Sequence, residues 1–316
     1  NNVLTDTDTV SIAITAVNDA PVLADTTLTL VTLDEDAAVP VGAVGTLVSA
    51  LVGGVTDVDD AAVKGIAVTA ADTTNGVYYY SLDDGANWTA FPAVSGSAAL
   101  LLAADSNTRV YFKPSANYNG TVSSALTIRA WDQTVGTAGG TANTSSNGGI
   151  TAFSSATDTV AVTVTAVNDA PVNAVPGAKT TAEDTALLIT GLQIDDLDAI
   201  ETQAATVSVN LAVGHGVLTV SAADATTYSV TLTNNNSASV TLEGSVADIN
   251  SLLAATGAVS YLPTLNYNSV APRSADTLTM TTSDLGNTGV VYDANHNLIN
   301  NVLTDTDTVS IAITAV

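Results

Sequence analysis

Residues 165–172 read Thr-Ala-Val-Asn-Asp-Ala-Pro-Val, and residues 15–22 carry the same eight letters. A run of alternating apolar residues precedes each copy, as in Val160, Val162 and Val164. Alternation with a period of two is typical of a half-buried β-strand, and the proline that follows ends regular structure. The phrase therefore predicts the last strand of one module and a short link to the next.

Repetition around this phrase fixes the number of modules. Residues 1–17 recur without a change as residues 300–316, and Asn18 and Asn168 open two stretches of similar length. The sequence predicts an orphan last strand of a preceding repeat at 1–17, one repeat at 18–167 and a second at 168–316. The orphan strand has no sheet of its own, so it should stay unpaired or exchange onto another copy. The chain should otherwise be monomeric.

Composition narrows the class of partner. The chain has 6 Lys and Arg against 31 Asp and Glu, which gives a formal net charge of −25 and disfavours nucleic acid and anionic membrane surfaces. Asp outnumbers Glu, a bias that favours turns and cation ligands. The absence of Cys excludes disulfides and thiolate metal sites. No apolar run approaches the roughly 20 residues of a membrane span.

Short alternating segments separated by turns predict an all-β fold of two tandem antiparallel sandwiches of the immunoglobulin-like kind. Strands are expected near 44–51, 66–69, 77–81, 110–112 and 126–131, followed by long polar loops at 133–157 and 283–308. One short helix is expected at 245–255 in the second module. There Ser245 can cap the first turn, and Ile249, Leu252 and Leu253 form one apolar face.

The path of the chain through such a sandwich predicts where acidic residues gather. The first strand ends at the pole where the chain leaves the module, so Glu35 should face the next module. Later strands return Asp57, Asp59 and Asp132 to the opposite pole, where the chain came in. By the same path the second module gathers its own carboxylates beside the Asn-Asp pair of the link.

Carboxylate, amide and carbonyl oxygens are the ligands of hard cations such as Ca²⁺, at about 2.3 to 2.6 Å. We therefore predict Ca²⁺ at the joint between modules, where it would bind neighbouring repeats of the same chain to each other. The candidate ligands are Glu35, Asn168, Asp169, Asp195, Asp196, Asp198, Asp284, Asn18, Asp19, Asp57, Asp59, Asp132 and Glu183.

Each acidic residue also has a purely structural interpretation, because an Asp in a β-turn binds neighbouring backbone N–H groups. That interpretation is preferred for Asp60, Asp83, Asp84 and Asp224, which stand outside the repeated phrases. An enzymatic function is not expected. His215 and His296 are the only imidazoles, and the sequence has no nucleophile elbow, phosphate-binding glycine loop or zinc-spaced His pair.

Four phrases together carry a family resemblance: Glu183-Asp184-Thr185, Asp196-Leu197-Asp198, Asn117-Tyr118-Asn119-Gly120 and residues 167–171. They resemble cadherin repeats and, more closely, the cadherin-like and immunoglobulin-like extender repeats of giant bacterial surface adhesins secreted by the type I pathway, often called RTX adhesins. The link departs from the cadherin form Asp-x-Asn-Asp-Asn-x-Pro, because Ala16 and Ala166 replace its first Asp and its second Asn is missing. Fewer ions per joint are therefore expected.

The resemblance implies an extracellular stalk on the bacterial cell surface, stiffened by calcium and projecting an adhesive tip for attachment or biofilm formation. These modules would not touch the membrane themselves. The alternative is a binding module in which the long loops at 133–157 and 283–308 recognise a carbohydrate or a host protein, because loops often carry function.

Overall fold

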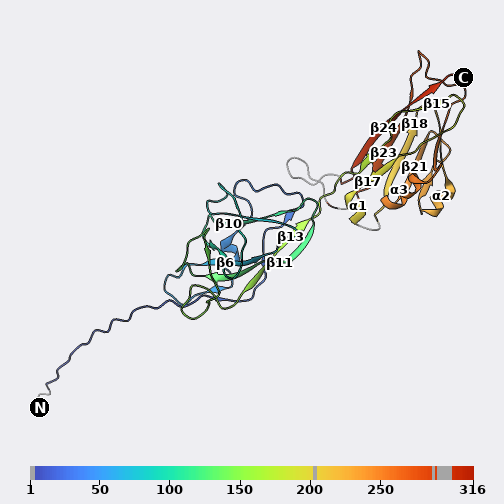
Figure 1. Cartoon of the computed structure of the whole chain (residues 1–316). Coiled ribbons are helices and arrows are strands. Elements are labelled where there is room, and N and C mark those ends of the chain that lie inside the picture. The colour runs from blue at the N-terminus through green and yellow to red at the C-terminus, as the bar shows by residue number, and fades with distance from the viewer. Residues whose placement is uncertain (1–3, 202–204, 287–288, 290–300) are drawn as a thin grey trace. The chain divides into compact units, whose positions relative to one another are not determined.

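The computed structural model describes residues 4–201, 205–286, 289 and 301–316. The chain divides into two compact units, Asn1–Thr165 (unit 1) and Ala166–Val316 (unit 2), which are described separately. The predicted boundary after Val167 lies close to this division. Among the described residues no helix is long and apolar enough to cross a membrane. Figure 1 shows both units with their strands labelled.

Unit 1 consists of short strands and one 3₁₀ helix. Its elements are Val22–Leu23 (β1), Leu28–Thr29 (β2), Leu33–Asp34 (β3), Thr46–Leu47 (β4), Val48–Leu51 (η1), Val55–Thr56 (β5), Gly65–Ala71 (β6), Gly76–Ser81 (β7), Thr89–Ala90 (β8), Ala99–Ala103 (β9), Arg109–Pro114 (β10), Gly120–Trp131 (β11), Thr141–Ala142 (β12) and Asp158–Thr165 (β13).

Two sheets face each other in unit 1. One has the order β12-β9-β6-β11-β13-β2, with β3 also on β13, and the other has the order β4-β10-β7-β8. Apolar residues of both sheets, such as Ile66 and Leu102 from the first and Phe112 and Tyr78 from the second, form one buried cluster. In β13 the predicted alternation is realised, because Val160, Val162 and Val164 are buried while the residues between them are more exposed. The predicted sandwich is therefore confirmed in this unit.

Unit 2 contains further strands and three short helices among its described residues. Its elements are Val172–Ala174 (β14), Lys179–Ala182 (β15), Leu187–Leu188 (β16), Gln193–Asp195 (β17), Leu197–Glu201 (α1), Val207–Val213 (β18), Gly216–Val220 (β19), Ala222–Thr227 (α2), Thr231–Thr233 (β20), Ser239–Gly244 (β21), Val246–Ala254 (α3), Val259–Pro263 (β22), Asp276–Ser283 (β23) and Thr304–Thr314 (β24).

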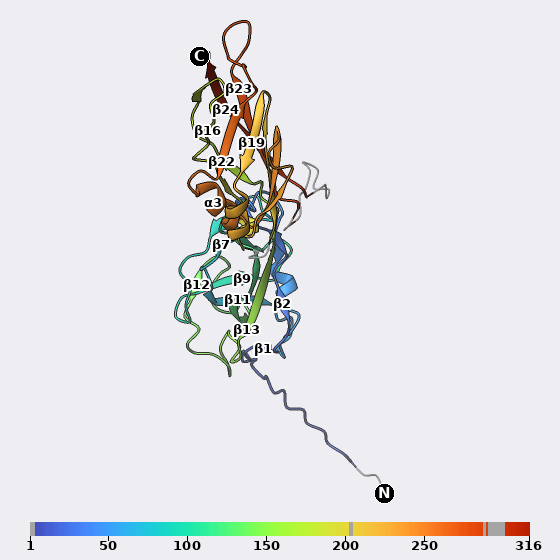
Figure 2. The same cartoon turned by 90° about the vertical axis from the view of Figure 1, so that its right-hand side faces the viewer.

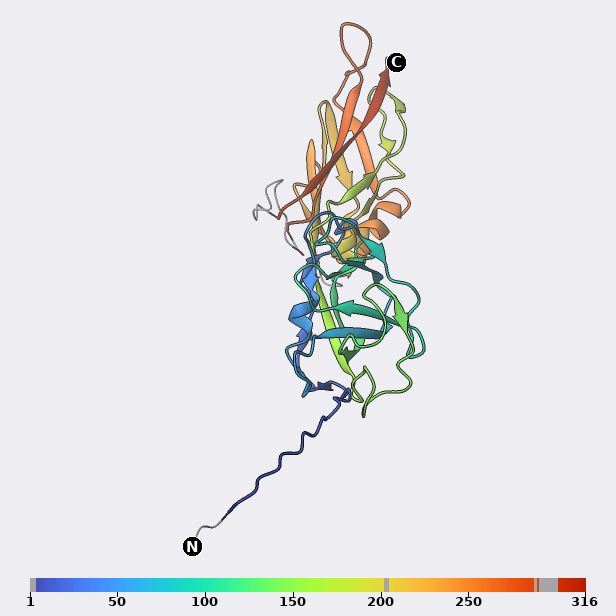
Figure 3. The ribbon, with the colours of Figure 1, turned by 90° about the vertical axis from the view of Figure 1, so that its left-hand side faces the viewer.

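The two larger sheets of unit 2 have the orders β15-β24-β23-β18-β21-β20 and β16-β22-β19, and β14 pairs with β17 in a third, two-stranded sheet. They close over one buried cluster that includes Leu211 and Ile311 of the larger sheet and Leu218 and Tyr261 of the smaller one. Figures 1 and 2 show α3 at the end of this unit opposite to the C-terminus. In Figure 3 the red strand β24 runs along the unit to the C-terminus.

The structure refines the prediction in three places. The edge pairs β2–β13, β3–β13 and β15–β24 are parallel, because the first and last strands of each sandwich run toward the same pole. The strand expected at 44–51 is the short β4 followed by the 3₁₀ helix η1. Unit 2 has α1 and α2 beside the expected α3, so the prediction of a single helix was wrong. The first two are too short to show a helical period in the sequence.

The helix α3 itself is confirmed. The Ser245 hydroxyl accepts a hydrogen bond from the backbone N–H of Asp248 at 3.1 Å, and Ile249, Leu252 and Leu253 are buried. Residues 4–17 contain no strand and are exposed up to Val17 (Figure 1).

Candidate metal centres at the poles of the units

The N-terminal pole of unit 1, where Asn18 and Asp19 join the sandwich, is held by two carboxylates. The side-chain amide of Asn18 donates to Asp132 Oδ2 at 2.8 Å and to the Thr151 carbonyl at 3.2 Å. The backbone N–H of Asp19 donates to Asp59 Oδ2 at 2.9 Å. Asp132 directly follows β11, so the sheet itself positions this carboxylate next to the link.

The N-terminal pole of unit 2 repeats this arrangement with its own residues. The amide of Asn168 donates to Asp284 Oδ2 at 2.5 Å and to the Asn301 carbonyl at 2.7 Å. The backbone N–H of Asp169 donates to Asp198 Oδ2 at 2.5 Å. The link phrase therefore makes the same three contacts in both units, although the sequences between the contacts differ.

Burial distinguishes the pole of unit 2. Asn168 and Asp198 are 5% exposed, Asp196 is 2% exposed and Asp284 is 1% exposed. The side-chain oxygens Asn168 Oδ1 and Asp196 Oδ2 are buried and have no hydrogen-bond partner in the part of the chain that the structure describes. The other Asp196 oxygen, Oδ1, accepts from the backbone N–H of Ala199 in α1 at 2.9 Å.

Burial is also the main reason that the pKa of Asp196 is raised above its usual value. The Ala199 hydrogen bond opposes this rise, whereas the nearby carboxylates of Asp198, Asp284 and Asp195 add to it. Ionised Asp196 is thus held in an unfavourable place, next to groups of like charge and largely out of water. A cation in its neighbourhood would reverse that cost.

The remaining N-terminal candidates lie close in sequence to those contacts. The backbone N–H of Asp59 donates to Asp57 Oδ1 at 3.0 Å, and Asp57 Oδ2 is buried without a hydrogen-bond partner among the residues described here. Asp195 accepts a hydrogen bond from the N–H of Asp196 at 3.0 Å and its side chain is exposed. Asp57 therefore belongs to the pole of unit 1, whereas Asp195 lies on the rim of the pole of unit 2.

The two glutamates lie at the opposite, C-terminal poles. In unit 1 the Glu35 N–H donates to the Thr165 carbonyl at the end of β13, at 2.9 Å. In unit 2 the Glu183 N–H donates to the Thr314 carbonyl at the end of β24, at 2.8 Å. Glu183 Oε1 also accepts from the Val316 N–H at 2.8 Å, which is the main reason that its pKa is lowered. Both side chains thus stand where the chain leaves a unit.

The residues that bind these glutamates were not predicted from the sequence. Asn119 and Asn268 donate their side-chain amides to Glu35 Oε2 and Glu183 Oε2 at 3.2 and 3.0 Å. In each unit, therefore, the Asn-Tyr-Asn phrase binds the Glu-Asp phrase, and the same arrangement occurs in both units. Their joint recurrence in both repeats was the signal that could have shown this.

Backbone geometry completes the device. The N–H groups of Asn117 and Asn266 donate to Asp36 Oδ1 and Asp184 Oδ1 at 2.9 and 2.8 Å. All four residues have φ between 57° and 61°, a left-handed conformation that Asn and Asp tolerate better than most residues. The turn after β3 and the turn after β15 are therefore each fixed from both sides, and the glutamate of each turn is fixed with it.

The candidate ligands have the oxygen atoms that a hard cation prefers, but their side chains are not arranged closely around one point. Within the described ranges, no three His, Cys, Asp or Glu side chains are close enough to hold a metal ion. Calcium binds amide, carbonyl and carboxylate oxygens. Among the described residues, the buried amide oxygen of Asn168 and one buried carboxylate oxygen of Asp196 have no hydrogen-bond partner and are of these types. The predicted ligand set as a whole stays a prediction.

The long loop expected at 133–157 packs onto unit 1. Phe153 and Ala152 join Trp131 in a second buried cluster on the outer side of the larger sheet, and Thr144 donates its backbone N–H to the Gly96 carbonyl. The loop expected at 283–308 is shorter than predicted, because residue 283 ends β23 and residues 304–308 belong to β24. Residues 287–288 and 290–300 of this loop, with His296, lie outside the described residues. His215 stacks its ring on Tyr267 at 4.1 Å between centroids.

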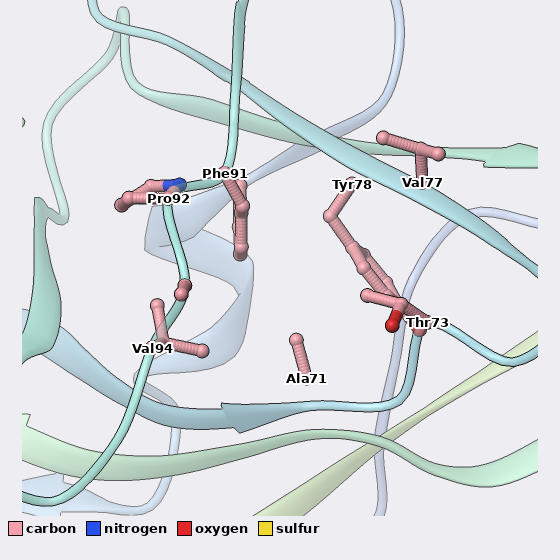
Figure 4. Close-up of a pocket in the computed structure, with 8 residues that line it drawn as sticks. Ala71, Thr73, Val77, Tyr78, Phe91, Pro92 and Val94 are labelled. Carbon is pink, nitrogen blue, oxygen red and sulfur yellow. The ribbon is translucent and has the colours of Figure 1, made fainter.

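A cavity of about 360 Å³ opens in unit 1 beside β7 (Figure 4). Its lining consists of Ala71, Thr73, Val77, Tyr78, Phe91, Pro92, Ala93 and Val94. The Tyr78 hydroxyl is buried and has no hydrogen-bond partner within the described ranges. Burial, with a smaller contribution from the Asp72 charge, raises the pKa of Tyr78.

No protein-family model and no curated protein sequence matches this chain. Solved structures with a similar course of the chain include cadherin repeats. Human mucin-like protocadherin EC1-2 has a TM-score of 0.31 at 14% identity and covers 95% of this chain and 97% of its own. Human CDH23 EC21-23 has a TM-score of 0.39 at 12% identity and covers 90% of this chain and 72% of its own. Human protocadherin-24 EC1-2 has a TM-score of 0.36 at 14% identity and covers 95% of this chain and 99% of its own. At these scores the similarity carries no argument about function.

Proposed function

We propose that this chain is a two-module stretch of the stalk of an extracellular bacterial adhesin secreted by the type I pathway. Calcium at the links would hold successive modules in a fixed orientation, and the stalk would project an adhesive tip. The observation that carries the proposal is the N-terminal pole of unit 2. There the link residue Asn168 is bound to the buried Asp284, and two buried oxygens have no hydrogen-bond partner among the described residues.

The energetic argument starts from the charges at this pole. Buried ionised carboxylates are costly unless a cation or several hydrogen bonds compensate them. The raised pKa of Asp196 shows that hydrogen bonds of the protein do not fully compensate this group. Calcium would compensate it, and the backbone and amide oxygens nearby would add neutral ligands. The six basic residues of the whole chain are too few to neutralise its carboxylates.

Each candidate residue has a role in this proposal. Asn168 and Asp169 would bring the link to the ion, and Asp196, Asp198 and Asp284 would supply the charge from unit 2. Unit 1 has the corresponding residues for a module that precedes it, namely Asn18, Asp19, Asp57, Asp59 and Asp132. Glu35 and Glu183 would supply a carboxylate from the C-terminal pole of one module to the ion of the next.

Calorimetric titration with calcium tests the proposal on a matched pair of variants. Asp198→Asn removes one charge at the pole while its oxygen can still accept the N–H of Asp169. Asp224→Asn removes one charge from the first turn of α2 in the same unit. We expect Asp198→Asn to weaken calcium binding by tenfold or more and Asp224→Asn to leave it unchanged. Equal binding by the wild type and Asp198→Asn would refute the assigned site.

A further inference from the structure

The four-stranded sheet of unit 1 has aromatic residues on its outer face. Its neighbouring strands β7 and β10 place Tyr79 directly opposite Tyr111, next to the pair of Tyr78 and Phe112 in the buried cluster. Successive residues of a strand point to opposite faces of a sheet, so Tyr79 and Tyr111 lie on the outer face. Tyr79 is partly exposed there, whereas Tyr111 is covered.

A loop and a tryptophan cover Tyr111. The Tyr111 hydroxyl donates to the Ala38 carbonyl at 3.2 Å, and Trp88 Nε1 donates to the Gly42 carbonyl at 3.1 Å. The ring centroids of Trp88 and Tyr111 are 5.9 Å apart in an edge-to-face arrangement. Residues 35–45, which connect β3 to β4, therefore form a wall beside the exposed tyrosine of this face.

The same face carries a lysine that has no carboxylate partner in the described part of the chain. Lys113 lies on β10 opposite Val77, which is 46% exposed. The Lys113 ammonium donates only to the Pro114 carbonyl, at 3.4 Å. Among the described residues, the one ion pair joins Arg109 to Asp84. A carboxylate from outside the chain can therefore reach an uncompensated cation here.

The fold does not require the exposed tyrosine and the lysine. The registers of β7 with β10 and of β19 with β22 match, because a Gly-Pro pair ends both ladders. In unit 2, Leu262 takes the place of Lys113, and Thr219 takes the place of Tyr79. The smaller sheet of unit 2 forms with these other side chains. Tyr79 and Lys113 are therefore available for binding.

We propose that the outer face of β7 and β10 binds a carbohydrate that carries a carboxylate. The C–H face of a sugar ring would pack on Tyr79, because an aromatic ring offers a flat apolar surface. The Lys113 ammonium would bind the sugar carboxylate. At physiological salt, charges more than about 8 Å away are largely screened, so the negative net charge of the chain does not prevent this contact.

This part of the sheet suits a sugar better than an extended peptide. β7 pairs with β10 on one side and with β8 on the other. An extended peptide binds by adding a strand to a free edge, and β7 has none at Tyr79. One aromatic ring and one charge make a small contact, so we expect a dissociation constant on the order of millimolar. The inference is independent of calcium and of a role in a stalk.

The test is a titration of the isotope-labelled full chain with sialyllactose, followed by NMR. Sialyllactose has one carboxylate, and its methyl ester has the same sugars without the charge. Both ligands should shift the amide signals of β7, β8 and β10 most. Sialyllactose should bind about fivefold more tightly than its ester, because it adds one exposed ion pair. Shifts that lie mainly in other strands, or no binding by either ligand, would overturn the inference.

Two variants take their new residues from unit 2, where the sheet accepts them. Lys113→Leu should remove the preference for sialyllactose over its ester. Tyr79→Thr should weaken both ligands by about tenfold, because the ring is lost. The control Lys179→Leu removes one charge from β15 of unit 2 and should change neither affinity.

Three results of these titrations would contradict the carbohydrate site. The first is a preference for sialyllactose that persists in Lys113→Leu. The second is equal binding of either ligand by the wild type and Tyr79→Thr. The third is binding of tetraglutamate as tight as that of sialyllactose and unaffected by Tyr79→Thr, which would indicate a site for any anion.

Discussion

The N-terminal poles of the two units use the same hydrogen bonds in different environments. Asn18 binds Asp132 as Asn168 binds Asp284, and Asp59 and Asp198 accept equivalent backbone N–H groups. In unit 1 Asn18, Asp57 and Asp59 are half-buried, whereas the corresponding residues of unit 2 are buried. The repeated phrase thus determines which residues form hydrogen bonds, and the burial of each pole determines the free energy of keeping its carboxylates ionised.

The unpaired buried oxygens show the same contrast. In the described part of unit 2 they are Asn168 Oδ1 and Asp196 Oδ2, both at the pole. In the described part of unit 1 one is Asp57 Oδ2 at the pole, and two belong to Tyr78 and Thr108 elsewhere in the sandwich. Unit 2 should therefore depend more strongly on a cation. Trp88 and Trp131 both belong to unit 1, so tryptophan fluorescence follows its unfolding alone.

The largest difference is expected when the link residue is truncated. Asn168→Ala should destabilise unit 2 by about 2 to 3 kcal/mol, because the buried Asp284 carboxylate loses a donor. Asn18→Ala should cost unit 1 less, about 1 kcal/mol, because water can reach the half-buried position of Asn18 and replace its amide as a donor to the buried Asp132. Urea unfolding followed by fluorescence and by circular dichroism separates the units. Equal losses would mean that burial does not distinguish the two poles.

Removing the charge of Asp196 should act in the opposite direction. In EDTA, Asp196→Asn should stabilise unit 2 by about 1 to 2 kcal/mol, because the neutral amide keeps the bond to the Ala199 N–H and avoids the burial of charge. In calcium the same substitution should be destabilising. Asp57→Asn, the matched change in unit 1, should have a smaller effect in both buffers. Thermal unfolding in each buffer measures both, and a gain that persists in calcium would contradict the account.

The dependence on pH should follow the raised pKa of Asp196. Between its usual value of 3.8 and its raised value the folded state binds the proton more tightly, so wild-type stability rises as the pH falls. In EDTA the stability that Asp196→Asn gains over the wild type should therefore shrink on acidification and vanish below pH 3.8.

The pKa of Asp83 is lowered, first by its bond to the Asn87 side chain, so the stability that Asp83 provides should be lost below pH 3.8. Unfolding measured over an acidic pH series would show opposite slopes for Asp196→Asn and Asp83→Asn.

The smallest effect concerns Tyr78. Its hydroxyl is buried and has no hydrogen-bond partner in the described part of the chain, so Tyr78→Phe should stabilise unit 1 by up to about 1 kcal/mol. The gain should be the same in calcium and in EDTA, because Tyr78 belongs to the cavity wall and not to the pole. Fluorescence-detected unfolding tests this, and a loss of stability would indicate that the hydroxyl has a partner in solution.

Regular patterns made much of the fold predictable. The alternation in β13 and β24 and the cap and apolar face of α3 are local signals, and each was found where it was expected. The helices α1 and α2 are too short to leave a period, and parallel pairing depends on the path of the whole chain. The packing of Phe153 under its polar loop was hidden because one aromatic residue in a Gly- and Ser-rich stretch carries no pattern.

The candidate metal ligands stay a prediction. The spacing of the repeats and the strand path indicated that Asp196, Asp198 and Asp284 gather near Asn168 and Asp169, but not which of these residues form hydrogen bonds with each other. Burial of Asp196 could not be foreseen, because it depends on α1 and on side chains that are distant in sequence. The role of Asn119 and Asn268 was missed because the contact joins two phrases that are far apart in each repeat.

Small-angle scattering of the wild-type chain in calcium and in EDTA tests most directly whether calcium fixes the orientation of the units. The account predicts an extended particle with one well-defined maximum dimension in calcium and a flexible, more broadly distributed one in EDTA. Asp198→Asn should resemble the EDTA state even when calcium is present, whereas Asp224→Asn should behave as the wild type. Scattering curves of the wild type that superimpose in the two buffers would contradict the account.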